Sequence, residues 1–351
     1  LSQTELENIL LRKAKENPLI ELLYQHQWQS LRQDDTAVKS EILDLKKETI
    51  FNIQSQYVLA ADGAGSRCRE FLEIPFIGPD KVDDFVSAFF ENNLRDYVQT
   101  PAKLFWIFNP EAAGTFIAHH IEKRWVYMQP IYLDYEKKES ITKAYLENKI
   151  KKALGNESLD IDVKSISYWR MSAQIAETFK KNRVILVGDA AHCFPPTGGL
   201  GMNTGIADAH NIAWKLQAVI QGWVDETFLD TYEIERKPIA EDNCKESLYN
   251  YHKILEVIEA FGLGRNDLEK LAKFKNTAPA KWLPITWLDK IVSIGAKMAR
   301  KKMDKFHSNT ALKEKGLTTI ADQIAHFDRI GLDIGYSYEQ VAYNFFWHYL
   351  D

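Results

Sequence analysis

The chain has 351 residues, of which 45% are hydrophobic and 26% charged, and its formal net charge is −5 at pH 7. These values are typical of a folded protein with one large core or two smaller ones, and they exclude an intrinsically disordered chain. The charge includes no Lys/Arg block that would serve nucleic acid or an anionic membrane, so the expected partners are small molecules.

The sequence also lacks the signals of membrane insertion, export and cross-linking. No apolar stretch approaches the roughly 18 residues of a membrane span, and the first residues have no apolar signal-peptide core. Cys68, Cys193 and Cys244 lie far apart without a CxxC pair, which argues against a disulfide framework or a zinc site. We therefore expect a soluble cytoplasmic protein. Because the sequence starts at Leu1, inside what reads as a helix, we also expect it to be the carboxyl-terminal part of a longer protein.

The first 61 residues predict a helix followed by strands. Apolar residues at helical spacing predict a helix over residues 2–17, before Pro18. Turns are expected at Asp34-Asp35 and Lys46-Lys47. Between these signals, runs rich in strand-forming residues predict strands at 19–25, 36–43, 49–54 and 57–61. The region reads as a β-meander that leads into a buried strand.

Residues 83–170 predict a half-buried antiparallel sheet. Strand-like segments occur at 84–90, 103–109, 114–121, 124–132 and 162–169, with a helix over 139–154. Aromatic residues are dense in this region: Phe105, Trp106, Phe108, Trp125, Tyr127 and Tyr132. Each ring taken singly is more often part of a core than of a ligand site. The alternative is that a few of them line a pocket for a flat ligand.

The segment 183–216 combines a buried strand, a loop and a helix. The apolar run 183–187 predicts a strand of a parallel sheet, and it ends at Gly188-Asp189. An acidic residue there is placed to accept hydrogen bonds from a sugar or ribityl chain. The helix that opens near Gly201 presents free N–H groups to negative charge. Glycines in the loop leave room for a flat ring, although the same glycines would also suit a turn without a ligand. Residues 202–306 read as successive helices.

A second strand, loop and helix lies at 57–70, where the strand ends at Asp62-Gly63. Ser66 is a suitable helix cap, and Arg69 lies one turn inward. Arg69 could hold a phosphate or carboxylate, or it could be purely structural. By itself this segment is as compatible with a simple capped turn as with a ligand site.

The two segments together resemble a known family. ADGAGSRCR at 61–69 and GDAAHCFPPTGGLGMNTG at 188–205 are similar to the Asp-Gly and Gly-Asp motifs of FAD-dependent aromatic-ring monooxygenases of the para-hydroxybenzoate hydroxylase fold, in the same order and spacing. Trp169 and the segments 228–247 and 326–338 look like the branch of phenol, chlorophenol and polyketide hydroxylases. The resemblance covers nearly the whole chain.

The resemblance implies an α/β fold of mixed α+β character. Residues 1–80 and 171–240 would form an FAD-binding Rossmann-like domain that is incomplete at its amino terminus. Residues 81–170 would be an inserted antiparallel-sheet domain for the substrate, and residues 241–351 a helical carboxyl-terminal region.

The resemblance also assigns roles to individual residues. Pro196 would sit beside the flavin ring near the substrate and is the catalytic candidate, and Asp62 would help to bind the pyrophosphate region. The other cofactor-binding candidates are Gln3, Gly188, Asp189, Gly199, Leu200, Gly201, Met202 and Asn203. Among them, Asp189 would bind the ribityl chain and the backbone of 200–203 would face the pyrimidine edge of the flavin.

The implied reaction is hydroxylation of a phenolic ring. FAD would be reduced by NADH or NADPH, O2 would be captured as a flavin hydroperoxide, and one oxygen would pass to the ring. The partners would be a small phenol and O2. A homodimer is possible, and no nucleic acid or membrane is expected as a partner.

Other readings have less support. The family begins with a βαβ unit carrying GxGxxG, which this sequence lacks. The alternative is therefore a catalytically inactive, truncated flavoprotein-like fold that serves as a binding or orphan domain. A flavin-dependent halogenase is disfavoured because WLPITW at 282–287 is not that class's signature. No metal is expected, because the spacing of His119, His120, His192 and His210 provides no ligand set.

Overall fold

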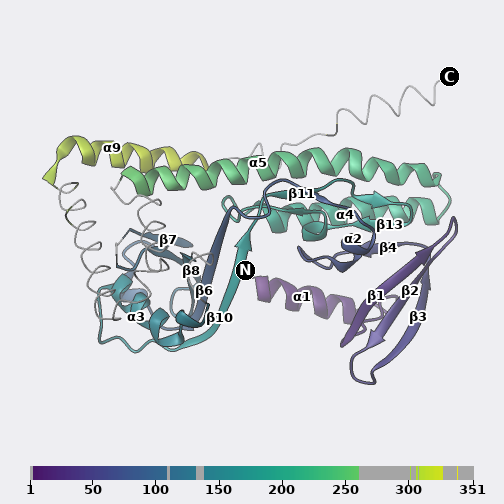
Figure 1. Ribbon diagram of the computed structural model, residues 1–351, viewed down its shortest axis with the longest axis horizontal. Coiled ribbons are helices and arrows are strands. Elements are labelled where there is room, and N and C mark those ends of the chain that lie inside the picture. Colours follow the sequence, from purple (N-terminus) through teal and green to yellow (C-terminus); the bar gives the residue numbers. More distant parts are fainter. Residues whose placement is uncertain are drawn as a thin grey trace, which may run out of the picture. The chain divides into compact units, whose positions relative to one another are not determined.

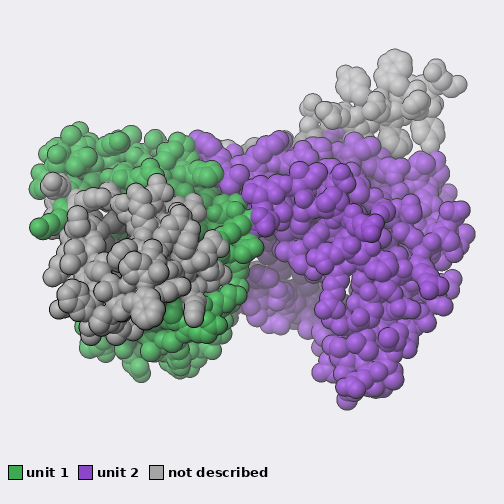
Figure 2. All heavy atoms as spheres, viewed as in Figure 1, with its two compact units in different colours: residues 1, 81–171, 251–327 green, residues 2–80, 172–250, 328–351 purple. Residues whose placement is uncertain are grey.

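The computed structural model describes residues 3–108, 111–131, 138–260, 301, 306, 308–326 and 338. The chain divides into two compact units (Figure 2). Unit 1 contains the described parts of 81–171 and 251–327, and unit 2 contains those of 2–80, 172–250 and 328–351. The assignment of these parts to cofactor and substrate stays a prediction.

Unit 2 begins with a helix and an antiparallel meander. Helix α1 (Gln3–Glu16) has no buried residue, and it is followed by β1 (His26–Gln33), β2 (Val38–Asp44) and β3 (Thr49–Ser55), paired in the order β1-β2-β3. The strand predicted at 19–25 was wrong, because no regular element occurs there and Leu19 is 91% exposed. The polar strand β1 was missed. Its strand form comes from pairing with β2 instead of from an alternating apolar pattern.

The centre of unit 2 is a short parallel strand pair (Figure 1). Strand β4 (Val58–Ala60) pairs in parallel with β13 (Val184–Leu186), and β12 (Lys180–Lys181) joins the other edge of β13. Val184, Ile185 and Leu186 are 0% exposed, which confirms the predicted strand of a parallel sheet. A second small sheet has the order β14-β11-β5, with β14 (His192–Cys193), β11 (Gln174–Ala176) and β5 (Phe76–Ile77).

The remaining elements of unit 2 connect these strands to two long helices. Helix α2 (Arg67–Phe71) follows β4, and the 3₁₀ turn η3 (Gly188–Ala190) follows β13. Helix α4 (Leu200–Ile220) is joined through η4 (Glu226–Leu229) to α5 (Asp230–Ala260). The predicted succession of helices after residue 202 is thus confirmed as far as residue 260.

Four side chains at the start of α5 hold it against the strands and α4. The hydroxyl of Tyr232 donates to the carbonyl of Leu186 at 2.8 Å, and Glu233 accepts from the amide of Phe179 at 2.8 Å. Glu235 and Arg236 form buried ion pairs with Lys215 and Asp208 of α4. These contacts fix the start of α5 to the strands and to α4.

Unit 1 contains a five-stranded antiparallel sheet, as predicted. Its strand order is β10-β6-β9-β8-β7. The strands are β6 (Asp83–Glu91), β7 (Leu104–Ile107), β8 (Gly114–His120), β9 (Arg124–Ile131) and β10 (Val163–Met171). Helix α3 (Lys143–Leu154) is capped by Thr142 and ends at a left-handed Gly155, and its Leu146 and Ile150 are fully buried. The short 3₁₀ turns η1 (Arg95–Tyr97) and η2 (Lys138–Ser140) complete the connections.

The two faces of this sheet differ in burial. One face belongs to the core with Leu146 and Ile150, and it carries Phe90, Phe116, Trp125 and Tyr127. The core role favoured by the sequence is confirmed for Trp125 and Tyr127, which are 1% and 0% exposed within this core, and Phe105 packs against it. Strand alternation directs their neighbours to the other face, which is half-buried.

The carboxyl-terminal region is described only in part. Helix α9 (Thr310–Ala321) packs Gly316 against Phe306 and continues into η5 (Asp322–His326). Tyr132, the segment 282–287 and all of 326–338 except His326 and Tyr338 lie outside the described residues. None of the helices that the structure describes is long and apolar enough to span a membrane.

Helix α4 leaves the large apolar side chains of Met202, Ile206 and Ile220 exposed, and Trp223 follows at 69% exposure. Because exposed apolar side chains promote association, we predict that Ile206→Gln combined with Ile220→Gln shifts the chain towards smaller species. Size-exclusion chromatography with light scattering over a concentration series measures this. Leu317→Gln, at a residue of similar exposure on α9, is the control and should change nothing. Equal association of all three proteins would contradict the prediction.

Candidate functional site

The parallel pair brings the two acidic loops to the same edge of the sheet. Val184 is opposite Val58 and Leu186 opposite Ala60, and the amide of Val187 extends the pair by donating to the carbonyl of Ala60 at 3.0 Å. Asp62 and Asp189 follow their strands by two and three residues, and both side chains are exposed. Residues 127 positions apart in the sequence thus come from neighbouring strand ends, where ligands of α/β sheets bind.

The Asp62 loop is held by local hydrogen bonds. Ser66 caps α2 by accepting from the amide of Arg69 at 3.0 Å, as predicted, and one carboxylate oxygen of Asp62 accepts from the amide of Cys68 at 3.1 Å. Gly63 has φ of 82°, a left-handed conformation that favours glycine. One oxygen of Asp62 therefore fixes its own loop, while the side chain stays open to solvent.

Arg69 connects the two loops by donating hydrogen bonds to a backbone carbonyl of each. Its Nη1 donates to the carbonyls of Ala64 at 3.1 Å and Ala190 at 3.3 Å, and its guanidinium lies 3.6 Å from the ring centre of Phe76. The residue is 6% exposed, and burial lowers its pKa. Of the two readings left open by the sequence, these contacts support the structural one.

The turn at Gly188 depends on close backbone packing. Gly188 has φ of 61°, and a Cβ at Gly205 would stand 3.4 Å from the Cα of Gly188. Cys193 Sγ donates to the carbonyl of Asp189, and burial raises the pKa of this thiol to about 12. Cys193 is therefore a neutral structural thiol, and it does not pair with its neighbour His192.

A buried carboxylate, not predicted from the sequence, lies behind this turn. Asp208 of α4 is 0% exposed and accepts from His192 Nε2 at 2.6 Å, Arg236 Nε at 2.7 Å and the amide of Gly188 at 3.3 Å. Burial by itself would raise the pKa of Asp208, but the hydrogen bond from His192 and the charge of Arg236 outweigh it and keep the pKa below its usual value. The spacing of these residues along the sequence gave no sign that they would meet.

The amino terminus of α4 is open to a ligand. Gly199 is left-handed at φ of 69°, no side chain caps the helix, and a side chain at Gly199 would meet nothing within 4 Å. The first amides of a helix have no acceptor within it, and the helix dipole gives this end partial positive charge. The end therefore offers donors and positive potential to an electron-rich group.

The predicted site residues separate into two groups. Those of the loops and α4 come together at one edge of unit 2, where Asp62, Asp189, Pro196 and Gly199 are exposed and Leu200 is buried; the others there are Gly188, Gly201, Met202 and Asn203. Gln3 belongs to the second group, because it is exposed on α1 and its side-chain hydrogen bond stays within that helix, to Glu7 at 2.9 Å.

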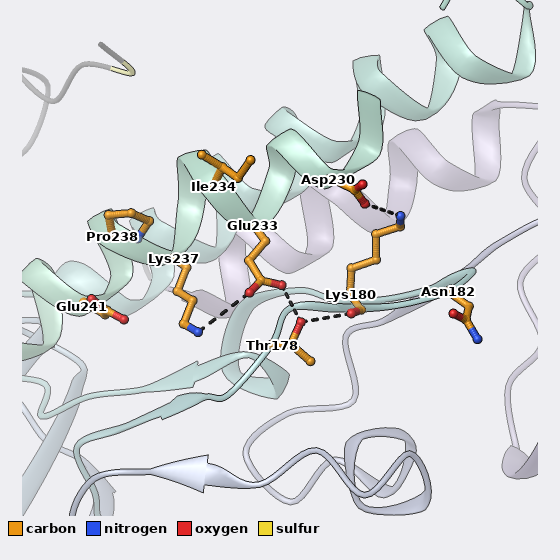
Figure 3. A pocket seen from close by; sticks show the side chains of 9 residues that line it. All are labelled: Thr178, Lys180, Asn182, Asp230, Glu233, Ile234, Lys237, Pro238 and Glu241. Carbon is orange, nitrogen blue, oxygen red and sulfur yellow. Dashed lines mark hydrogen bonds and ion pairs between the residues drawn. The ribbon is translucent and has the colours of Figure 1, made fainter. Parts of the chain in front are cut away.

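The hollow in Figure 3 is a different place. It has a volume of about 620 Å³ and lies between the residues around β12 and the first turns of α5. Its charges are largely paired, since Lys180 meets Asp230 at 2.6 Å and Lys237 approaches Glu233 at 3.8 Å. No predicted site residue lines it. Among the residues that the structure describes, no cluster of His, Cys, Asp and Glu could hold a metal.

Acidic loops at the ends of parallel strands, beside an uncapped helix start, are an arrangement with which α/β proteins bind nucleotides and flavins. The chain belongs to the FAD binding domain family, whose model matches residues 1–247. This confirms the resemblance drawn from the two motifs, and with it the mixed α/β fold class.

Two similar proteins are named as a hydroxylase and a monooxygenase. A protein named as a polyketide hydroxylase in Streptomyces halstedii is 35% identical over 68% of this chain and 44% of its own length. The 2,4-dichlorophenol 6-monooxygenase of Cupriavidus pinatubonensis is 31% identical over 68% of this chain and 41% of its own length. The chain thus spans less than half the length of these two relatives.

Solved structures give the same picture. Aklavinone-11 hydroxylase in complex with FAD and aklavinone matches with a TM-score of 0.67 and 32% identity, over 72% of this chain and 48% of that one. The flavin-dependent monooxygenase PieE matches with a TM-score of 0.80 over 96% of this chain and 55% of that one. Because the sequence identity with PieE is 24%, this match supports the fold alone.

The loop-bridging role of Arg69 generates a prediction. Arg69→Met leaves the carbonyls of Ala64 and Ala190 without this donor, so we expect a loss of about 1–3 kcal/mol in the free energy of unfolding. Urea titration measures it. Arg67→Met, at an exposed neighbour, should stay within about 0.5 kcal/mol of wild type. If both variants unfold at the wild-type midpoint, Arg69 does not bridge the loops.

Proposed function

We propose that this chain belongs to the FAD-binding and substrate-binding portion of an aromatic-ring hydroxylase. Unit 2 binds the flavin, and the sheet of unit 1 binds a phenol. The observation that carries the proposal is that neighbouring strand ends carry the exposed Asp62 and Asp189 loops near the uncapped start of α4, in a segment that matches the FAD binding domain family.

The residues present suit the flavin. Asp189 is exposed and acceptor-only, which fits the hydroxyls of a ribityl chain, and the amides of 200–203 are donors for the carbonyl-rich edge of the ring. Gly199 leaves open space where a side chain would stand, and Pro196 is exposed on the same loop. We assign Asp62 to the pyrophosphate side and Gln3 to the cofactor as well, both from the resemblance alone.

The proposed reaction consumes one NADH or NADPH and one O2. When bound, the flavin supplies the redox chemistry: hydride from the nicotinamide provides two electrons, one oxygen atom enters the ring as a hydroxyl, and the other leaves as water. The chain's own groups bind and orient. The start of α4 stabilises negative charge by its fixed dipole.

The substrate side is proposed on the half-buried face of the unit 1 sheet. Direct strand partners share a face, and one such row runs across the sheet through Ser167, Ser87, Met128, Thr115 and Trp106. This row contains hydroxyls, a thioether and an indole but no charged side chain. A face of this kind suits a neutral or weakly acidic phenol, whereas a carboxylate would call for an arginine fork.

Flavin binding is tested at Asp189. Asp189→Ala removes a charge-assisted hydrogen bond, which should weaken FAD binding about ten- to a hundred-fold, or 1.5–3 kcal/mol. Quenching of flavin fluorescence on titration measures the affinity. Asp160→Ala makes the same charge change at an exposed residue of unit 1 and should bind like wild type. Undiminished affinity in the Asp189 variant would refute the assignment.

The substrate face is tested with a panel of phenols and benzoates. NAD(P)H consumption and product mass are followed together, and we expect coupled hydroxylation of phenols, because a ring hydroxyl raises electron density at the carbon that is oxidised. Met128→Lys should weaken phenol binding roughly tenfold, since the ligand would have to desolvate a charge. Asn52→Lys on exposed β3 is the control. Hydroxylation of benzoates that lack a ring hydroxyl, with phenols inert, would contradict the proposal.

A further inference from the structure

We propose that Asp208 is a positioning residue, which presets the turn carrying Asp189 by holding both sides of it with one buried carboxylate. The inference rests on the proposed function, because it concerns the same flavin site. It adds residues from α4 and α5 that do not reach the exposed side of the loop.

Both ends of the turn meet the same oxygen. Oδ2 of Asp208 accepts from the amide of Gly188 at 3.3 Å and from His192 Nε2 at 2.6 Å. Gly188 precedes Asp189 directly, and His192 follows it by three residues. Since a carboxylate can only accept, Nε2 of His192 carries the proton in this contact. The backbone of Asp189 is therefore confined between two anchored positions.

The carboxylate is itself fixed from behind. Its other oxygen, Oδ1, accepts from Arg236 Nε at 2.7 Å, and Nη2 of Arg236 donates to the carbonyl of Thr204 at 3.3 Å. Asp208 and Arg236 are both 0% exposed, so water does not compete for these contacts. A buried charge pair with all its contacts made is rigid, and removing one partner leaves the other uncompensated.

The turn needs such a support because its backbone is unusual. Gly188 is left-handed at φ of 61°, and it approaches Gly205 so closely that a Cβ on Gly205 would be 3.4 Å from it. Asp208 lies one helical turn beyond Gly205 on α4. The close approach and the hydrogen bonds thus hold the same segment. Because the backbone of Asp189 is already ordered before a ligand binds, less conformational entropy is lost on binding.

Two variants of His192 separate positioning from general stability. His192→Phe keeps an aromatic ring beside Phe194, which His192 stacks on at 5.0 Å, but removes the donor to Asp208. His192→Gln restores an N–H at a similar reach. We expect FAD affinity to fall roughly tenfold in the first variant and to stay within about twofold of wild type in the second.

Hydrogen exchange supplies a readout that does not need the flavin. Peptides covering residues 186–193 should exchange faster in His192→Phe and at the wild-type rate in His192→Gln. Lys215→Met is the matched control, because it breaks the other buried ion pair of α4 and α5, Lys215 with Glu235 at 2.7 Å, away from the turn. It should lower the unfolding midpoint without a specific effect on 186–193. Asp208→Asn is a second, stronger variant, expected to loosen the turn more than His192→Phe.

The outcomes are distinct. Faster exchange limited to 186–193, with weaker FAD binding and rescue by glutamine, supports the inference. Unchanged hydrogen exchange in His192→Phe overturns the inference. Faster exchange spread over the whole of unit 2, as a general loss of stability would cause, also overturns it. So does wild-type FAD affinity in a variant whose 186–193 peptides exchange faster. If the wild-type chain does not bind FAD at all, the proposed function fails, and the exchange of 186–193 alone decides whether Asp208 positions the turn.

Discussion

Two buried ion pairs between α4 and α5 are the constraint on which unit 2 depends. Asp208 with Arg236 and Lys215 with Glu235 place four charges where three are 0% and one 9% exposed. Taking a charge out of water is costly unless its contacts are complete. The helices can therefore pack in only one register, because a shift of either would leave several charges without partners at once. Burial lowers the pKa of Lys215, and its pairing with Glu235 offsets that cost only in part.

The proposed flavin-binding edge of unit 2 combines buried supporting residues with exposed acidic side chains. The side chains that would touch a ligand, Asp62 and Asp189, are exposed, whereas Arg69 and Asp208 behind them are buried and bind backbone groups of the loops. Recognition and support are thus separate sets of residues. An exposed acid that is mobile loses rotamer freedom on binding, and a fixed backbone limits that loss to the side chain itself.

Much of this arrangement followed from local signals in the sequence. Apolar runs marked β13, glycine and proline marked the loop after it, and Ser66 marked the cap of α2. Local signals could not predict contacts between segments that are distant in the sequence. Strand β1 is polar and gains its form from β2, while the apolar segment 19–25 finds no partner and stays irregular. Likewise, alternation alone could not tell which face of β9 is the core, so the sequence left open whether a few of its aromatic rings line a pocket. Asp208 met His192 and Arg236 only through the packing of α4.

The sheet of unit 1 has a consequence for how such a protein can diversify. Its strands alternate between a closed core around Trp125 and Tyr127 and an open row through Met128 and Thr115. Adjacent residues along β9 are therefore under different structural constraints. A substitution at Tyr127 disturbs a side chain that is 0% exposed, whereas Met128 is half-buried and packs against the smaller cluster of Phe85, Met171 and Tyr251. Substitutions on the half-buried face should therefore cost less folding free energy than substitutions on the core face, so sequence change is expected to accumulate there first.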